Sequence, residues 1–104
     1  MSNTALAFTN DESQHRYEAT LDGQLAGYAE YNLLTDAIMF THTEVLPERE
    51  GLGVASSLAR HVLDEARARG LQVIPTCPFI SGWIHKHHEY ADLVRPDVQR
   101  AFKI

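Results

Sequence analysis

The 104-residue chain has one cysteine, one tryptophan and no long run of apolar residues. A single thiol, Cys77, cannot form an internal disulfide, which is typical of a reducing compartment and predicts a cytoplasmic location. No stretch approaches the roughly 18 apolar residues of a membrane span. Residues 1–10 also lack the basic start and the apolar run of a signal peptide. We therefore expect no association with a membrane.

Positive charge is scarce as well. Nine Lys and Arg residues stand against fourteen Asp and Glu residues, which gives a net charge of −5. The basic residues are scattered and form no stripe that could neutralise the phosphates of a nucleic acid, so we expect no nucleic-acid partner. The length and an apolar content of 44% predict one globular domain over residues 1–104.

The first half of the chain has the residue pattern of strands. Asp22-Gly23 is a strong signal for a hairpin turn, and a second turn is predicted at 34–36. The apolar residues at 5–8 predict either a short edge strand or an arm. The three strands of an antiparallel meander are expected at 15–21, 24–33 and 37–45.

The period changes after Gly53. Val54, Leu58, Val62 and Ala66 are spaced four apart, which predicts a helix over 53–69 that Gly70 terminates. A short strand at 71–76 is expected to lie parallel to the strand at 37–45. Further helices are expected from Pro78 to about His88 and over 97–103. The order β-β-β-α-β-α, with one more helix, predicts an α+β domain with a mixed sheet.

The segment from Val45 to Ala55 carries the clearest chemical signal. Glycines at 51 and 53 let the backbone approach a ligand closely, because no Cβ stands in the way. They precede a helix N-terminus, whose free N–H groups and partial positive charge favour a phosphate. No Lys-Ser/Thr pair follows, so this is no nucleotide P-loop, and Ser56 replaces the third glycine of a dinucleotide fingerprint. The segment predicts a pyrophosphate site made mostly of backbone.

This strand, double-glycine turn and helix resemble the GNAT superfamily of acyl-CoA-dependent N-acetyltransferases. The GNAT signature Gln/Arg-x-x-Gly-x-Gly/Ala corresponds here to Glu50-Gly51-Leu52-Gly53-Val54-Ala55. The first position departs from the signature, because Glu50 replaces Gln or Arg. Arg49, one residue earlier, is in a position to supply the missing charge.

Three further motifs, His42-Thr43-Glu44-Val45, Thr76-Cys77-Pro78-Phe79 and residues 87–94, are similar to small single-domain GNAT proteins of the YjdJ type. The resemblance covers about residues 13–94. It implies a compact GNAT-like mixed sheet, an antiparallel meander followed by β-α-β-α, without the helices that larger members carry between their first two strands. Those helices help to cover the acceptor amine, so their absence implies an open, shallow acceptor site.

The resemblance also implies a cofactor, acetyl-CoA or coenzyme A, bound as a substrate. The strand at 37–45 would pair with the pantetheine arm as with an added strand, and Pro47, which lacks an N–H, would end the pairing. Lys86 would contact the phosphate or adenine end. The residues assigned to the cofactor are Val45, Leu46, Arg49, Glu50, Gly51, Leu52, Gly53, Val54, Ala55, Ser56 and Lys86.

Three residues are candidates for catalysis. Cys77 is expected near the thioester, either as a covalent acyl acceptor activated by the following helix or as a residue that only lines the site. His42 and Glu44 share one face of their strand and are candidates for the general base. The alternative for this pair is a His42 that is hydrogen-bonded in the core and a Glu44 that is solvated.

His85, His87 and His88 are close in sequence but have no Asp, Glu or Cys partner at a metal-motif spacing, so we expect no metal site. Trp83 and Tyr90 are expected in the core rather than as a platform for a nucleobase. The function predicted is acetyl-CoA-dependent N-acetyl transfer to an unidentified primary amine, by a monomer or weak homodimer. The alternative is a non-enzymatic acyl-CoA-binding or interaction module of the same fold.

Overall fold

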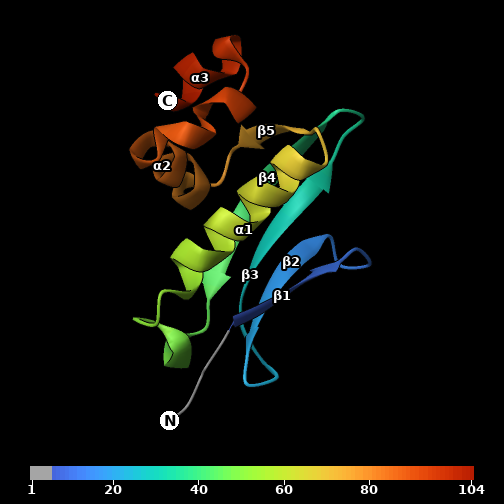
Figure 1. Ribbon diagram of the computed structural model, residues 1–104, viewed down its shortest axis with the longest axis vertical. Coiled ribbons are helices and arrows are strands. Elements are labelled where there is room, and N and C mark those ends of the chain that lie inside the picture. The colour runs from blue at the N-terminus through green and yellow to red at the C-terminus, as the bar shows by residue number, and fades with distance from the viewer. Residues whose placement is uncertain (1–5) are drawn as a thin grey trace.

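The computed structural model describes residues 6–104 and contains a five-stranded sheet with helices (Figure 1), and the sheet is mixed, as predicted. Of the two alternatives left open for residues 5–8, the structure has the edge strand, from Leu6, and residue 5 lies outside the described residues. Two short 3-10 helices, η1 and η2, were not expected. The elements in chain order are β1 Leu6–Asp11, β2 Arg16–Leu21, β3 Gln24–Leu33, β4 Ala37–Val45, η1 Pro47–Arg49, α1 Val54–Ala68, β5 Gln72–Pro75, α2 Pro78–Lys86, η2 His88–Leu93 and α3 Pro96–Phe102.

The strands lie in the order β1-β2-β3-β4-β5. β1 to β4 are antiparallel neighbours, and β5 joins β4 in parallel after the crossover through α1. The turn at Asp22 and Gly23 joins β2 directly to β3, with positive φ angles of 54° and 78°. No helix therefore separates β2 from β3, in agreement with the sequence.

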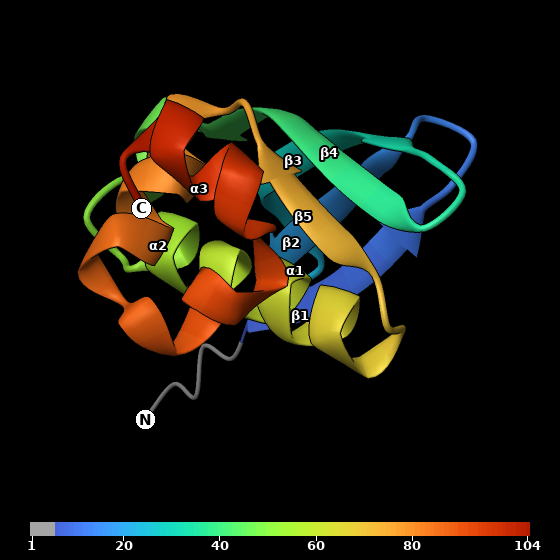
Figure 2. The same cartoon turned by 90° about the horizontal axis from the view of Figure 1, so that it is seen from above.

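α1 and α2 pack against the same face of the sheet, and Figures 1 and 2 show α1 lying across it. The apolar side of α1 is buried as its spacing predicts, in one core cluster with Tyr17 and Phe40 of the strands. The opposite face of β2, β3 and β4 carries mainly polar side chains, which lie outside the buried core. We refer to this as the outer face; its polar residues are Arg16, Glu18, Tyr28, Glu30, His42 and Glu44.

Gly27 permits the close packing of α1 on the sheet. A Cβ at this position would lie 2.8 Å from the carbonyl oxygen of Glu44 and 3.2 Å from Cγ1 of Val54. A side chain would therefore push the start of α1 and the end of β4 apart.

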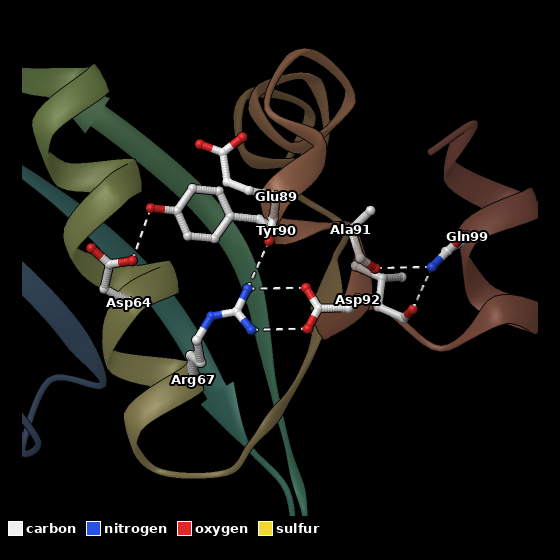
Figure 3. Close-up of polar contacts among 8 residues, drawn as sticks. Asp64, Arg67, Glu89, Tyr90, Ala91, Asp92 and Gln99 are labelled. Atoms are coloured by element: carbon white, nitrogen blue, oxygen red, sulfur yellow. Dashed lines mark hydrogen bonds and ion pairs between the residues drawn. The ribbon is translucent and has the colours of Figure 1, made fainter.

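A polar clamp ties α1 to η2 (Figure 3). Arg67 binds both carboxylate oxygens of Asp92, at 2.8 and 3.0 Å, and donates to the carbonyl of Glu89 at 2.8 Å. The hydroxyl of Tyr90 donates to Asp64 of α1 at 2.8 Å. These contacts fix the position of α1 relative to the segment that follows α2. None of the helices within residues 6–104 is long and apolar enough to cross a membrane.

Candidate functional site

The turn between η1 and α1 leaves several backbone N–H groups free. The first intrahelical bond of α1 runs from the N–H of Ser57 to the carbonyl of Gly53, at 3.0 Å, and no side chain caps the helix. The N–H groups of residues 54–56 precede that bond, so they have no carbonyl of their own helix to bind. They border a hollow of about 150 Å³, the turn hollow, lined by Val45, Arg49, Glu50, Gly51, Gly53, Val54, Ala55 and Ser56.

The two glycines of the turn satisfy a backbone requirement that the sequence motif alone did not reveal. Gly51 and Gly53 have φ angles of +83° and +76°, in the left-handed region that side chains with a Cβ rarely adopt. A Cβ on either residue would meet no atom within 4 Å. In the free protein, glycine is therefore required at both positions for the backbone conformation. The close approach between backbone and ligand that the sequence predicts is a separate requirement, which applies when a ligand is bound.

Eight of the eleven residues assigned to the cofactor surround the turn hollow. Leu46 does not line it; its N–H donates to the carbonyl of Ala26 on β3 at 2.9 Å. Leu52 is 58% exposed and lines a neighbouring hollow beside β1. Lys86 lies in a separate hollow between α2 and α3, so the structure does not bring it to the turn. The Arg49 guanidinium donates to Oε1 of Gln24 at 3.1 Å, which ties the turn to β3.

β4 has a free edge next to the turn hollow. Its pairing with β5 stops at Phe40 and Pro75, although β4 continues to Val45. The N–H of Leu46 points toward β3. Successive residues of a strand direct their backbone groups to opposite edges. The N–H groups of Thr43 and Val45 therefore point to the other edge, on the β5 side. β4 therefore has an unpaired edge, to which a ligand in an extended conformation can add as a further strand.

A bulge in β4 orients the side chains around this edge. Glu30 pairs with His42 and Tyr31 with Phe40, so Thr41 is an extra residue opposite β3. The bulge shifts the alternation, so His42 does not share the buried face of Phe40, two residues earlier, and Thr43 faces the helices instead. Alternation predicts that Thr43 and His42 lie on opposite faces, but it does not predict this shift, because a bulge depends on the register with β3.

Cys77 lies at the closed end of the free edge. It is the N-cap of α2, is 3% exposed, and its Sγ donates to Oγ1 of Thr43 at 3.3 Å. Its N–H and the hydroxyl of Thr76 both donate to the carbonyl of Phe40, at 2.9 and 2.7 Å. These bonds anchor the start of α2 where β4 and β5 separate.

His42 and Glu44 share the outer face, as predicted, and both are about half exposed. Nε2 of His42 lies 3.0 Å from Oε1 of Glu44, and the hydroxyl of Tyr28 donates to the same oxygen at 3.2 Å. The hydrogen bonds from His42 and Tyr28 lower the pKa of Glu44, so it is ionised at neutral pH and only accepts hydrogen bonds. His42 therefore carries its proton on Nε2 when neutral, which leaves the lone pair of Nδ1 available.

Tyr28 was not predicted as part of this group. It pairs directly with Glu44 across β3 and β4, and its pKa is raised by burial and by the Glu44 charge. Only the strand register brings these two residues together. The group lies on the face of the sheet opposite Cys77, with the free edge of β4 between them.

Two of the clustered histidines bind backbone carbonyls, and the rings of His85 and His88 lie edge to face with centres 6.1 Å apart. Nδ1 of His85 contacts the carbonyl of Lys103 at 2.8 Å, and Nδ1 of His87 contacts that of Trp83 at 2.9 Å. Across residues 6–104, no group of three or more His, Cys, Asp and Glu side chains is arranged to hold a metal ion.

The chain is similar to known proteins in sequence and fold. A family model described as GCN5-related N-acetyl-transferase matches residues 16–93. The solution structure of a GCN5-like putative N-acetyltransferase from Staphylococcus aureus is 24% identical, with 91% of each chain covered and a TM-score of 0.64. The crystal structure of the ribosomal-protein-S18-alanine N-acetyltransferase from Escherichia coli is 23% identical, with a TM-score of 0.55. That likeness covers 58% of this chain and 39% of the E. coli enzyme. At these identities the two solved structures support the fold alone. A comparison with curated proteins returned no match.

Proposed function

Because the chain belongs to the GCN5-related N-acetyltransferase family, we propose that it transfers an acetyl group from acetyl-CoA to a primary amine. The observation that carries this proposal is the turn hollow, which has free helix N–H groups and opens beside the free edge of β4. A ligand that joins a pyrophosphate to an arm containing amides matches both features.

The cofactor would bind largely through backbone groups. Pyrophosphate oxygens would accept from the N–H groups at the start of α1, with the Arg49 guanidinium as the nearby cation. The amides of the pantetheine arm would pair with Thr43 and Val45 on β4. An arm that runs along this edge from the turn leads toward Cys77, where the thioester would lie.

The acceptor would approach from the outer face, where His42 is suited to act as general base. Nδ1 of His42 would take a proton from the ammonium group, and the resulting amine would attack the thioester carbonyl carbon. The C–S bond then breaks, coenzyme A leaves with the electron pair on sulfur, and the second proton of the attacking nitrogen passes to that thiolate, which leaves the neutral amide and the free thiol. Glu44 and Tyr28 would hold the imidazole in the tautomer that this step needs.

Direct attack by the amine is favoured over an acyl-cysteine route. A nucleophilic Cys77 must be a thiolate, whereas its thiol donates a hydrogen bond to Thr43 and is almost fully buried. We therefore assign Cys77 to the lining of the acyl site.

Two measurements test the proposal. Calorimetry with CoA, acetyl-CoA and longer acyl-CoAs should detect binding, and initial rates with a polyamine, a lysine peptide and small amines should detect transfer. His42→Gln should lower the rate by about 100-fold, at the lower end for a general base, while CoA affinity is retained. Absence of binding to all the CoA compounds would refute the proposal.

The second candidate is a non-enzymatic acyl-CoA-binding or interaction module. It is favoured by the direct turn between β2 and β3, where no helix is present to cover an acceptor, and by the carboxylate of Glu50 at the turn hollow. Binding of acetyl-CoA without transfer to any amine, unchanged by His42→Gln, would support this module instead.

A further inference from the structure

A second hollow of about 400 Å³ lies beside the turn hollow, over the exposed side of α1. Ser56 lines both hollows, so the two are adjacent. We call it the α1 groove; its lining residues are Phe8, Ser56, Ser57, Arg60, His61, Asp64 and Trp83.

The α1 groove combines one permanent cation with aromatic rings. The Arg60 guanidinium lies 5.7 Å from the ring centre of Trp83 and donates weakly to the hydroxyl of Tyr90 at 3.4 Å. The ring of His61 stacks on Phe8 at 4.4 Å. A ligand with both a flat ring and a negative group suits such a surface.

Trp83 differs here from the expectation that it is a core residue. Ile84 and Tyr90 are buried, whereas Trp83 is only partly buried and stacks on His87 at 3.8 Å. Its Nε1 is buried without a hydrogen-bond partner in the described part of the chain. The ring is therefore positioned by packing and forms one wall of the groove.

We infer that the α1 groove binds the phosphorylated adenosine end of coenzyme A, with Arg60 on the 3′-phosphate and Trp83 against the base. This inference rests on the proposed function, because it assumes a pyrophosphate in the turn hollow. The 3′-phosphate is attached to the ribose that also carries the pyrophosphate. Ser56 and Arg60 are four residues apart on one helix face, about 6 Å along the axis, so Arg60 is one turn beyond the turn hollow.

The other nearby cations fit less well. Lys86 and Lys103 line a hollow that shares no residue with the turn hollow or the α1 groove. Asp64 is a carboxylate within the groove, and it accepts the Tyr90 hydroxyl at 2.8 Å. A phosphate on Arg60 would be repelled by Asp64, so the two side chains should affect affinity in opposite directions.

The test compares CoA with dephospho-CoA, which lacks the 3′-phosphate, by calorimetry. Arg60→Gln should weaken CoA binding about tenfold and leave dephospho-CoA nearly unchanged, because only the charge-assisted contact is lost. Asp64→Asn should strengthen CoA binding, and Lys86→Gln, the matched control, should change neither ligand. An unaltered preference for CoA in Arg60→Gln would overturn the inference while the proposed function stands, whereas a protein that binds neither compound would refute both.

A second readout uses Trp83, the single tryptophan of the chain. Titration with adenosine 3′,5′-bisphosphate, which has no pantetheine arm, should change the tryptophan fluorescence of the wild type. The Arg60→Gln variant should need a higher ligand concentration to reach half of that fluorescence change. Unchanged fluorescence at saturating CoA would overturn the contact between Trp83 and the base.

Discussion

Gly53 determines how the chain enters α1. Its left-handed backbone allows β4, the turn and the helix to meet around the turn hollow. Gly70 has a comparable φ of +69° at the other end of the same helix, where it makes the C-terminal cap through bonds to Arg67 and, via Leu71, to Ala66. The two glycines therefore carry a similar conformational demand in different surroundings.

Gly53→Val should weaken CoA binding by at least about tenfold, or roughly 1.4 kcal/mol. The valine side chain would be strained at this φ and would stand over the helix N–H groups. Calorimetry measures the affinity, and thermal unfolding of Gly70→Val provides the control, because that variant has similar backbone strain away from the hollow. Equal CoA affinities of folded Gly53→Val and the wild type would contradict the assignment of the turn hollow.

Cys77 gives a second prediction for a single residue. If it only lines the acyl site, Cys77→Ala should keep the transfer rate within a few-fold, because the amine attacks the thioester directly. Intact-protein mass spectrometry after incubation with acetyl-CoA should then detect no acetylated wild type. A stable acetyl adduct on Cys77, together with loss of transfer in both Cys77→Ala and Cys77→Ser, would establish the covalent route instead.

Among the elements, the two ends of α1 make different contributions: one borders the candidate site and the other holds the fold together. Its N-terminus borders the turn hollow, and its C-terminal half is attached to η2 by the contacts of Arg67 with Asp92 and Glu89 (Figure 3). The bidentate ion pair is partly exposed, with Asp92 at 66% and Arg67 at 45%, so screening limits its contribution to stability to no more than about 1 kcal/mol.

Asp92→Asn should lower stability at pH 7, and the difference from wild type should disappear in acid. The hydrogen bond from Arg67 lowers the pKa of Asp92 from its ordinary value of 3.8, so the ion pair stabilises the fold above that value. The stabilisation is lost as the pH falls through the lower pKa of the folded state. Urea unfolding from pH 7 to pH 2.5 measures it.

Asp97→Asn provides the comparison for this measurement. Asp97 forms an exposed pair with Arg95, only two residues away, and its pKa is also lowered by that partner. Because this pair joins no separate elements, its loss should affect stability less. An effect of Asp92→Asn that is independent of pH would show that the ion pair is not its cause.

For the whole molecule, features that depend on nearby residues were predictable from the sequence. The spacing of Val54 and Leu58 predicted α1, and Asp22-Gly23 predicted the hairpin between β2 and β3. The bulge at Thr41 and the contact of Tyr28 with Glu44 depend on strand register, which local patterns do not specify. The separation of Lys86 from the turn and the partial exposure of Trp83 depend on how α2 rotates against α1, which its composition leaves open.

The free edge of β4 has a consequence for amide hydrogen exchange. The N–H groups of Thr43 and Val45 point to the side where β5 has ended, so they should exchange rapidly with solvent in the free protein. The N–H of Leu46 is bonded to Ala26 and should exchange more slowly, which makes it an internal control. Saturating acetyl-CoA should protect Thr43 and Val45 and leave Leu46 nearly unchanged, as measured by NMR. Equal protection of Thr43 and Val45 before and after addition of the cofactor would mean that the arm does not pair with β4. If the pantetheine arm does pair with β4, the substrate takes the place of β5 beside the part of β4 that extends beyond the pairing of Phe40 with Pro75.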